Sequence, residues 1–317
     1  MRAVPTSEYY DLHQLADGVF AAVARVNSPA FSNAGIIDTG DHTLIFDTFN
    51  TYQAALDLRQ AALSLTGRPG DFVIVSHAHS DHWMGNQVFV DHAEIIATHQ
   101  VNTSMIAEAD QTRALKHRPD EYGTYCEDTE VRLAETHDPR WRAHLTWTIE
   151  ILRHQLRNLK SVVPVTASQT FDGRVVFHGS KRTADLYTPG PGHTQSDAVL
   201  QLPDDGIAFI GDLGFFQTHP YLGDSLPEKW VLTLDLMADS YIETFVPGHG
   251  PVGTKSDLLA LRDYIIALEK SAADVAASGG TKDDAASQRE PEISKGWSGF
   301  GRLEGAMRYL FQMKNGD

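Results

Sequence analysis

The sequence has little cysteine, no long apolar run and few positive charges. Cys126 is the single cysteine among 317 residues, so no disulfide can form within the chain. No stretch approaches the roughly 18 consecutive apolar residues of a membrane-spanning helix, and the first six residues lack the apolar centre of a secretion signal. We therefore expect a cytoplasmic protein that makes no contact with a membrane.

The charge balance is strongly acidic. Lys and Arg number 26 against 42 Asp and Glu, which gives a formal net charge of −16. Because a nucleic-acid-binding surface needs a basic stripe, we expect no nucleic acid partner. Hydrophobic residues make up 42% of the chain, which is enough for a sizeable core.

The most distinctive segment is the H-x-H-x-D-H run of His77, His79, Asp81 and His82. It follows the apolar residues 72–75, which predict a buried strand. Imidazole nitrogen and carboxylate oxygen suit zinc, iron or manganese. Three imidazoles and an acid buried together have little structural use without a metal, so the run predicts a metal site.

Three more candidate ligands each follow a strand-like segment. His193 lies in a glycine-rich turn, Asp212 follows residues 207–211, and His249 lies in the turn P-G-H-G. Taken singly, the histidines could cap turns and Asp212 could form an Asx-turn or cap a helix. Their common setting, shared with the first cluster, favours metal ligation instead.

Taken in order, Asp47 after a strand, H-x-H-x-D-H, G-H-T, G-D and P-G-H-G resemble the motifs of the metallo-β-lactamase-fold hydrolase superfamily, over roughly residues 17–270. The resemblance implies an α/β fold, a four-layer αββα sandwich of two similar halves with a two-metal site along one edge. It also implies the ligand sets, which are His77, His79 and His193 for the first ion and Asp81, His82 and His249 for the second. Asp212 would bridge the ions, and Asp47 would support the site without binding metal.

The resemblance further implies two zinc ions per chain, with iron or manganese as alternatives, and Asp81 and Asp212 as catalytic residues. The expected function is hydrolysis of a small acyl substrate (a lactone, thioester, ester or cyclic amide, including a β-lactam) by attack of a metal-bridging hydroxide. An acid at position 212 is similar to glyoxalase II, lactonases and phosphodiesterases, whereas true β-lactamases typically carry Cys or Ser there. Two alternatives stay open, a mononuclear iron oxygenase of the sulfur-dioxygenase type and a phosphodiesterase.

The loop after Asp212 is rich in aromatic residues, and we expect Phe216, His219 and Tyr221 to line the substrate pocket. Lys and Arg are few near the motifs. An aromatic wall of this kind suits an uncharged or partly apolar small-molecule substrate better than a polyphosphate.

The expected domain covers residues 1–279, interrupted by a helical insertion at about 100–160, and residues 280–317 form a tail that packs on it. Within the first half, we expect strands between residues 18 and 47 and a helix that ends near Gly67. A later helix would start at Ser256 and end at Gly279, followed by a polar, mobile segment to Glu292.

The insertion contains a clear helix start, with Asp138 as N-cap and Pro139 at the first helical position. One apolar stripe then follows along this helix, made of Trp141, Leu145, Ile149, Leu152, Leu156 and Leu159. Three interpretations of the stripe stay open, which are packing within the domain, a lid over the substrate and a homodimer contact.

Overall fold

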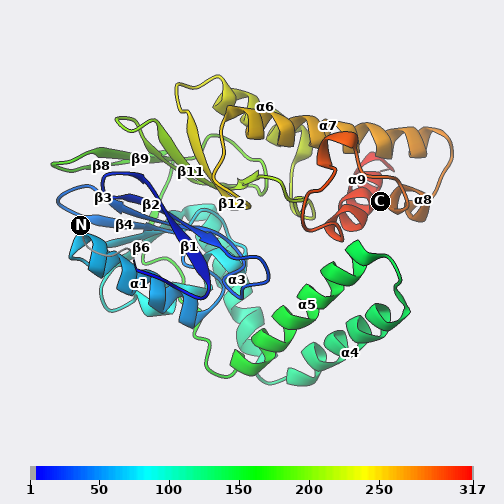
Figure 1. Cartoon of the computed structure of the whole chain (residues 1–317), viewed down its shortest axis with the longest axis horizontal. Coiled ribbons are helices and arrows are strands. Elements are labelled where there is room, and N and C mark those ends of the chain that lie inside the picture. The colour runs from blue at the N-terminus through cyan, green and yellow to red at the C-terminus, as the bar shows by residue number, and fades with distance from the viewer. Residues whose placement is uncertain (1–4, 316–317) are drawn as a thin grey trace.

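The computed structural model describes residues 5–315, and it shows two β-sheets packed face to face with helices on their outer sides (Figure 1). Residues 1–4 lie outside the described residues. They belong to the N-terminal segment from which we expect no secretion signal. The predicted αββα sandwich is confirmed.

The two sheets differ in size. The larger sheet has the order β1-β2-β3-β4-β5-β6-β7. Its strands are β1 (Tyr10–Ala16), β2 (Val19–Ala24), β3 (Ala34–Asp38), β4 (Thr43–Phe46), β5 (Phe72–Ile74), β6 (Glu94–Thr98) and β7 (Gln169–Phe171). The smaller sheet has the order β12-β11-β10-β9-β8. Its strands are β8 (Arg174–His178), β9 (Thr183–Tyr187), β10 (Val199–Leu202), β11 (Ile207–Phe215) and β12 (Thr244–His249).

Apolar side chains fill the space between the sheets. Ile37, Leu44 and Ile74 of the larger sheet pack in one buried cluster with Leu200 and Phe209 of the smaller one. This burial removes apolar surface from water and holds the two sheets in one position relative to each other, so that the ends of β5, β11 and β12 meet along one edge.

Helices cover the outer face of each sheet. On the larger sheet, α1 (Tyr52–Thr66) starts at Thr51, whose side chain accepts a hydrogen bond from the Ala54 amide, and ends at Gly67 with φ 85°. This end matches the prediction, because glycine adopts the left-handed conformation without steric cost. The smaller sheet is covered by α6 (Pro227–Ala238) and α7 (Lys255–Ala277), whose buried residues form a separate core cluster with those of β11. Short helices α2 (Ser80–Trp83) and η1 (Met84–Val88) follow β5.

The insertion consists of α3 (His99–Leu115), α4 (Pro119–Glu135) and α5 (Pro139–Asn158). As predicted, Asp138 caps α5, and its Oδ1 accepts from the Arg140 amide at 2.8 Å. Ile149 and Leu152 of the apolar stripe are buried against Cys126 of α4. This part of the stripe therefore packs within the insertion itself.

Two predictions for the C-terminal region are wrong. The N-cap of α7 is Thr254 rather than Ser256, because Thr254 and Asp257 form a capping box in which Asp257 Oδ2 accepts from the Thr254 amide at 2.8 Å. The segment expected to be mobile contains α8 (Lys282–Ala286), where Thr281 and Asp284 form a second capping box. A 3-10 turn, η2 (Glu292–Ser294), follows it.

Residues of the C-terminal helix are buried against the smaller sheet and its helices. Leu303, Met307 and Leu310 of α9 (Arg302–Asn315) are buried in the core cluster of the smaller sheet. Among residues 5–315, no helix is both long and apolar enough to cross a membrane.

Candidate metal centre

The seven predicted ligands come together at the edge where strand ends of both sheets meet. His77 and His79 lie in the loop after β5, Asp81 and His82 in α2, and His193 between β9 and β10. His249 is the last residue of β12, whereas Asp212 lies inside β11 rather than after it. They form two groups, each able to hold a metal ion. The first group is His77, His79, His193 and Asp212, and the second is Asp81, His82 and His249.

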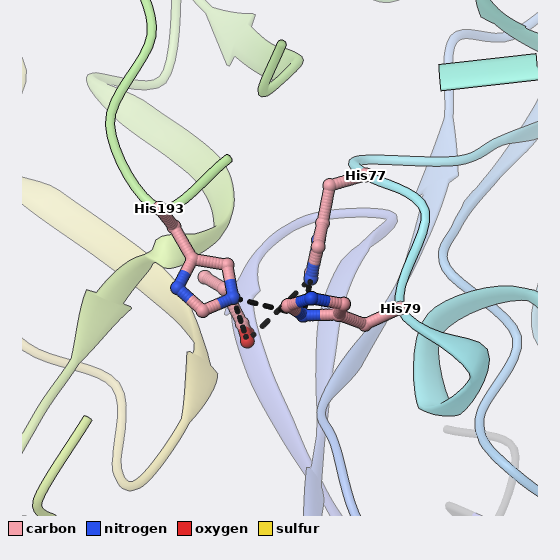
Figure 2. A group of neighbouring side chains, drawn as sticks. His77, His79 and His193 are labelled. Atoms are coloured by element: carbon pink, nitrogen blue, oxygen red, sulfur yellow. Dashed lines mark hydrogen bonds and ion pairs between the residues drawn. The ribbon is translucent and has the colours of Figure 1, made fainter. Parts of the chain in front are cut away.

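In the first group, three imidazoles point toward one another (Figure 2). His79 Nδ1 lies 3.1 Å from His77 Nε2 and 3.0 Å from His193 Nε2. Asp212 Oδ2 lies 3.2 Å from His193 Nε2 and 3.6 Å from His77 Nε2. Three ring nitrogens and one carboxylate oxygen therefore surround a common point.

The second group uses the other oxygen of the same carboxylate. Asp212 Oδ1 lies 3.1 Å from His82 Nε2 and 3.4 Å from His249 Nε2. Asp81 Oδ2 lies 3.4 Å and 3.3 Å from these two nitrogens. The two oxygens of Asp212 thus face different groups, which is the arrangement of a bridging ligand.

The residues fit metal ions. Within residues 5–315, the buried atoms Asp81 Oδ2, His82 Nε2 and Asp212 Oδ1 make no hydrogen bond. Buried polar atoms without a partner are costly and rare, so a shared set of them fits the binding of a cation. Nitrogen and carboxylate donors in this ratio suit zinc, iron or manganese.

Charge coupling inside the centre is strong. Burial opposes ionisation of Asp212, but His249 and His82 hold the pKa of its carboxyl well below the usual range. Burial would likewise lower the pKa of the His82 imidazole, but Asp212 and Asp81 raise it well above its ordinary value. The carboxylates therefore keep their negative charge, which is the state that binds a metal ion.

Asp47 has the position expected of a supporting acid. Its Oδ1 accepts from the Ser76 amide and its Oδ2 from the Ser76 hydroxyl, both at 2.8 Å. Oδ2 also lies 2.8 Å from His82 Nδ1. Asp47 has φ 58°, a left-handed conformation that non-glycine residues adopt at a cost and that often marks a functional site.

Two supporting acids were missed at the sequence level. Asp224 Oδ2 lies 3.0 Å from His79 Nε2, a contact between residues 145 positions apart that no local pattern indicates. Asp197 accepts hydrogen bonds from the Gly192 and Thr194 amides and so holds the turn that carries His193. Asp197 could have been predicted from the sequence, because it follows the ligand His193 by four residues in a glycine-rich turn. Burial raises the pKa of its carboxyl to about 7.

Aromatic rings surround the centre, but some of the residues that we expected there lie elsewhere. Phe215 stacks on His249 with 4.9 Å between ring centroids, and Tyr221, which is 47% exposed, meets His79 edge-on at 5.6 Å. The prediction that Phe216 and His219 line the substrate pocket is wrong. Both are buried in the protein core, and His219 Nδ1 lies 2.7 Å from the Tyr264 hydroxyl.

A cavity of about 180 Å³ lies under the insertion, beside the centre. Its wall includes Ser80, which stands between two ligands, together with Glu108 of α3 and His154 of α5. Burial raises the pKa of the Glu108 carboxyl to about 7. None of the seven ligands lines this cavity, so it is a neighbouring space and not the metal centre itself.

Comparison with known proteins agrees with the geometry. The family model for the metallo-beta-lactamase superfamily matches residues 27–249. Among solved structures, the metallo-beta-lactamases of Pontibacter korlensis and Hirschia baltica are each 17% identical, with TM-scores of 0.56 and 0.55, and the alignments cover 81% of this chain and 98% of theirs. FIM-1 from Pseudomonas aeruginosa, in a mono-zinc form, is 16% identical with a TM-score of 0.54 over 83% of this chain and 97% of its own.

At these identities the solved structures support the fold alone, but the family model spans most of the chain, including all seven ligands. The chain therefore belongs to the metallo-beta-lactamase superfamily.

Proposed function

We propose that this protein is a hydrolase of small acyl substrates that works with two zinc ions. His77, His79 and His193 would hold the first ion and Asp81, His82 and His249 the second. The observation that carries the proposal is the position of Asp212, whose two oxygens each face a different group. A single-ion centre would leave one set of buried donors without a partner.

When bound, two divalent ions would polarise a carbonyl group and supply a water molecule ionised near neutral pH. The chain's own residues would do the rest. Asp81, which is 8% exposed, can orient that water and accept its proton. Phe215 and Trp230 pack against His249 and His193 and keep these rings in place. Since Trp230 is fully buried and Tyr221 is exposed, substrate would enter on the Tyr221 side.

The aromatic surroundings favour an acyl carbon over a phosphodiester. Phe215 and Tyr221 offer apolar surface beside the ligands. We propose lactones and thioesters ahead of cyclic amides, because Asp212 stands where β-lactamases proper typically carry Cys or Ser.

The test is a side-by-side assay of zinc-loaded protein with lactones, thioesters, β-lactams and bis-aryl phosphodiesters. The expected result is that the best acyl substrate exceeds the best phosphodiester at least about tenfold in kcat/KM, or about 1.4 kcal/mol. Phosphodiesters ahead by that factor would contradict the acyl assignment. One iron ion per chain with oxygen consumption would favour the sulfur-dioxygenase alternative instead.

A further inference from the structure

Arg302, at the start of α9, lies inside a frame of aromatic rings. Its guanidinium carbon is 5.7 Å from the ring centroid of Phe31, 5.6 Å from that of Trp147 and 5.7 Å from that of Phe215. These rings come from the loop between β2 and β3, from α5 of the insertion and from β11. We call these three residues the aromatic frame.

The aromatic frame borders the metal centre. Phe215 stacks on His249, and Phe31 meets the same imidazole edge-on, with 5.6 Å between ring centroids. Trp147 stacks on Phe31 at 5.0 Å. Two of the three rings around the guanidinium therefore touch one metal ligand, which places Arg302 beside the second group of ligands.

The electrostatic environment agrees with this position. Burial lowers the pKa of the Arg302 guanidinium, while the negative charges of Asp212 and Asp81 act in the opposite direction. Arginine stays charged in proteins, so a positive charge stands beside the centre. This cation comes from the C-terminal helix, far in sequence from the motifs.

Most donors of Arg302 are unused. Nη1 donates to the His219 carbonyl at 3.1 Å. In the described part of the chain, Nε and Nη2 make no hydrogen bond, and no carboxylate pairs with this guanidinium, although the residue is partly buried. In contrast, Arg308, which lies six residues further along α9, pairs with Glu304 at 3.0 Å and also with Asp283.

The start of α9 is held firmly against the insertion. A Cβ at Gly301 would lie 1.9 Å from His144 Cδ2 of α5, so only glycine allows this approach. The backbone next to Arg302 therefore packs directly against the His144 side chain of α5.

We propose that Arg302 is a specificity-determining residue that binds a carboxylate group of the substrate. The unused Nε and Nη2 lie on one edge of the guanidinium, and two parallel N–H donors match the two oxygens of a carboxylate. The aromatic frame would contact the apolar part next to that carboxylate. The substrate class is thus a small acyl compound with a carboxylate near its reacting carbon, and this assignment rests on the proposed function.

The test uses zinc-loaded protein and two matched probes, phenylacetate and its uncharged analogue phenylacetamide, with binding measured by calorimetry or competition. Arg302→Gln should weaken phenylacetate binding about 10- to 100-fold, because a charge-assisted pair is lost. It should leave phenylacetamide binding within about threefold and the zinc content unchanged. Arg302→Lys should fall in between, and Arg308→Gln is the matched control that should bind like the wild type.

Activity gives a second readout. If the acyl hydrolase function is correct, Arg302→Gln should raise KM for a carboxylate-bearing ester much more than for the neutral ester of the same shape. If no ester is hydrolysed, the proposed function fails, but the binding experiment still tests Arg302. Equal phenylacetate affinity in wild type and Arg302→Gln, or no binding to the wild type, would overturn the inference. An equal loss for both probes would also overturn it, because it would show a purely structural role.

Discussion

The carboxylate of Asp47 lies 2.8 Å from Nδ1 of His82, and both side chains are buried. This contact lets Nδ1–H donate to Asp47 and leaves Nε2, which carries no hydrogen bond, facing Asp212 and Asp81. A supporting acid of this kind fixes the ring orientation of a metal-binding histidine and raises its basicity.

Asp47→Asn should therefore weaken the binding of the second ion and leave the binding of the first unchanged. We expect the affinity for the second zinc ion to fall about 10- to 100-fold. Dialysis against graded zinc concentrations, followed by elemental analysis, measures this directly. Asp11→Asn is a control, since Asp11 is exposed and pairs with Arg25 on the surface. Unchanged affinity for both ions would show that Asp47 does not orient His82.

Asp212→Ala should loosen both ions, because its two oxygens serve both groups. The fold should survive, since strand pairing does not depend on this carboxylate. Asp81→Ala is the matched comparison and should loosen only the second ion. We expect near-normal circular dichroism with most metal and hydrolytic activity lost in Asp212→Ala. Activity within a few-fold of the wild type at limiting metal would show that Asp212 is a strand residue without a role in metal binding.

Asp197 should make stability depend on pH. Burial raises the pKa of its carboxyl from 3.8 to about 7. Between these two values the folded protein keeps a proton that the unfolded chain has lost, so stability falls as pH rises through this range. Relative to Asp197→Asn, which cannot ionise, the wild type should lose about 1.4 kcal/mol per pH unit between about pH 4 and pH 7.

The measurement is chemical denaturation of metal-free wild type and Asp197→Asn at pH 5, 6, 7 and 8. Contributions from the histidines cancel in the difference between the two proteins. A stability difference that stays constant from pH 5 to pH 7 would rule out the raised pKa.

Leu152 tests the role of the insertion. Because it is 7% exposed and packs in one cluster with Cys126 and Ile149, Leu152→Ala should destabilise the insertion by about 2–3 kcal/mol and leave the zinc content intact. Val131→Ala, at a residue of α4 that is 56% exposed, is the control and should change little. Thermal melting and hydrodynamic mass check both. The homodimer stays a prediction, and a change of mass without loss of stability would mean that Leu152 meets a second copy.

The metal ligands were predictable because short local motifs carry them. H-x-H-x-D-H places four candidates within six residues, and the strand before it indicates where they point. The start of α5 was predictable for the same reason, since Asp138 and Pro139 are adjacent signals. The start of α7 shows the limit of this approach, because Thr254 with Asp257 outcompetes Ser256 two residues away.

Arg302, Asp224 and Trp147 could not be found in this way. Each reaches the centre through tertiary contacts between segments far apart in the chain, such as the stacking of Trp147 on Phe31. The expectation for Phe216 failed because neighbouring residues at the end of β11 face opposite directions, and His219 lies against Tyr264 of α7. Phe215 faces the ligand His249, whereas Phe216 belongs to the core under α7.

The measurement that tests the central claim most directly is the zinc stoichiometry of the full chain. Metal-free protein is titrated with zinc, and the bound ions are counted by elemental analysis and by mass spectrometry under native conditions. The structure predicts two ions per chain, with one ion per chain in Asp81→Ala. A wild-type chain that never binds more than one ion at saturating zinc would contradict the bridging role of Asp212 and the two-ion centre.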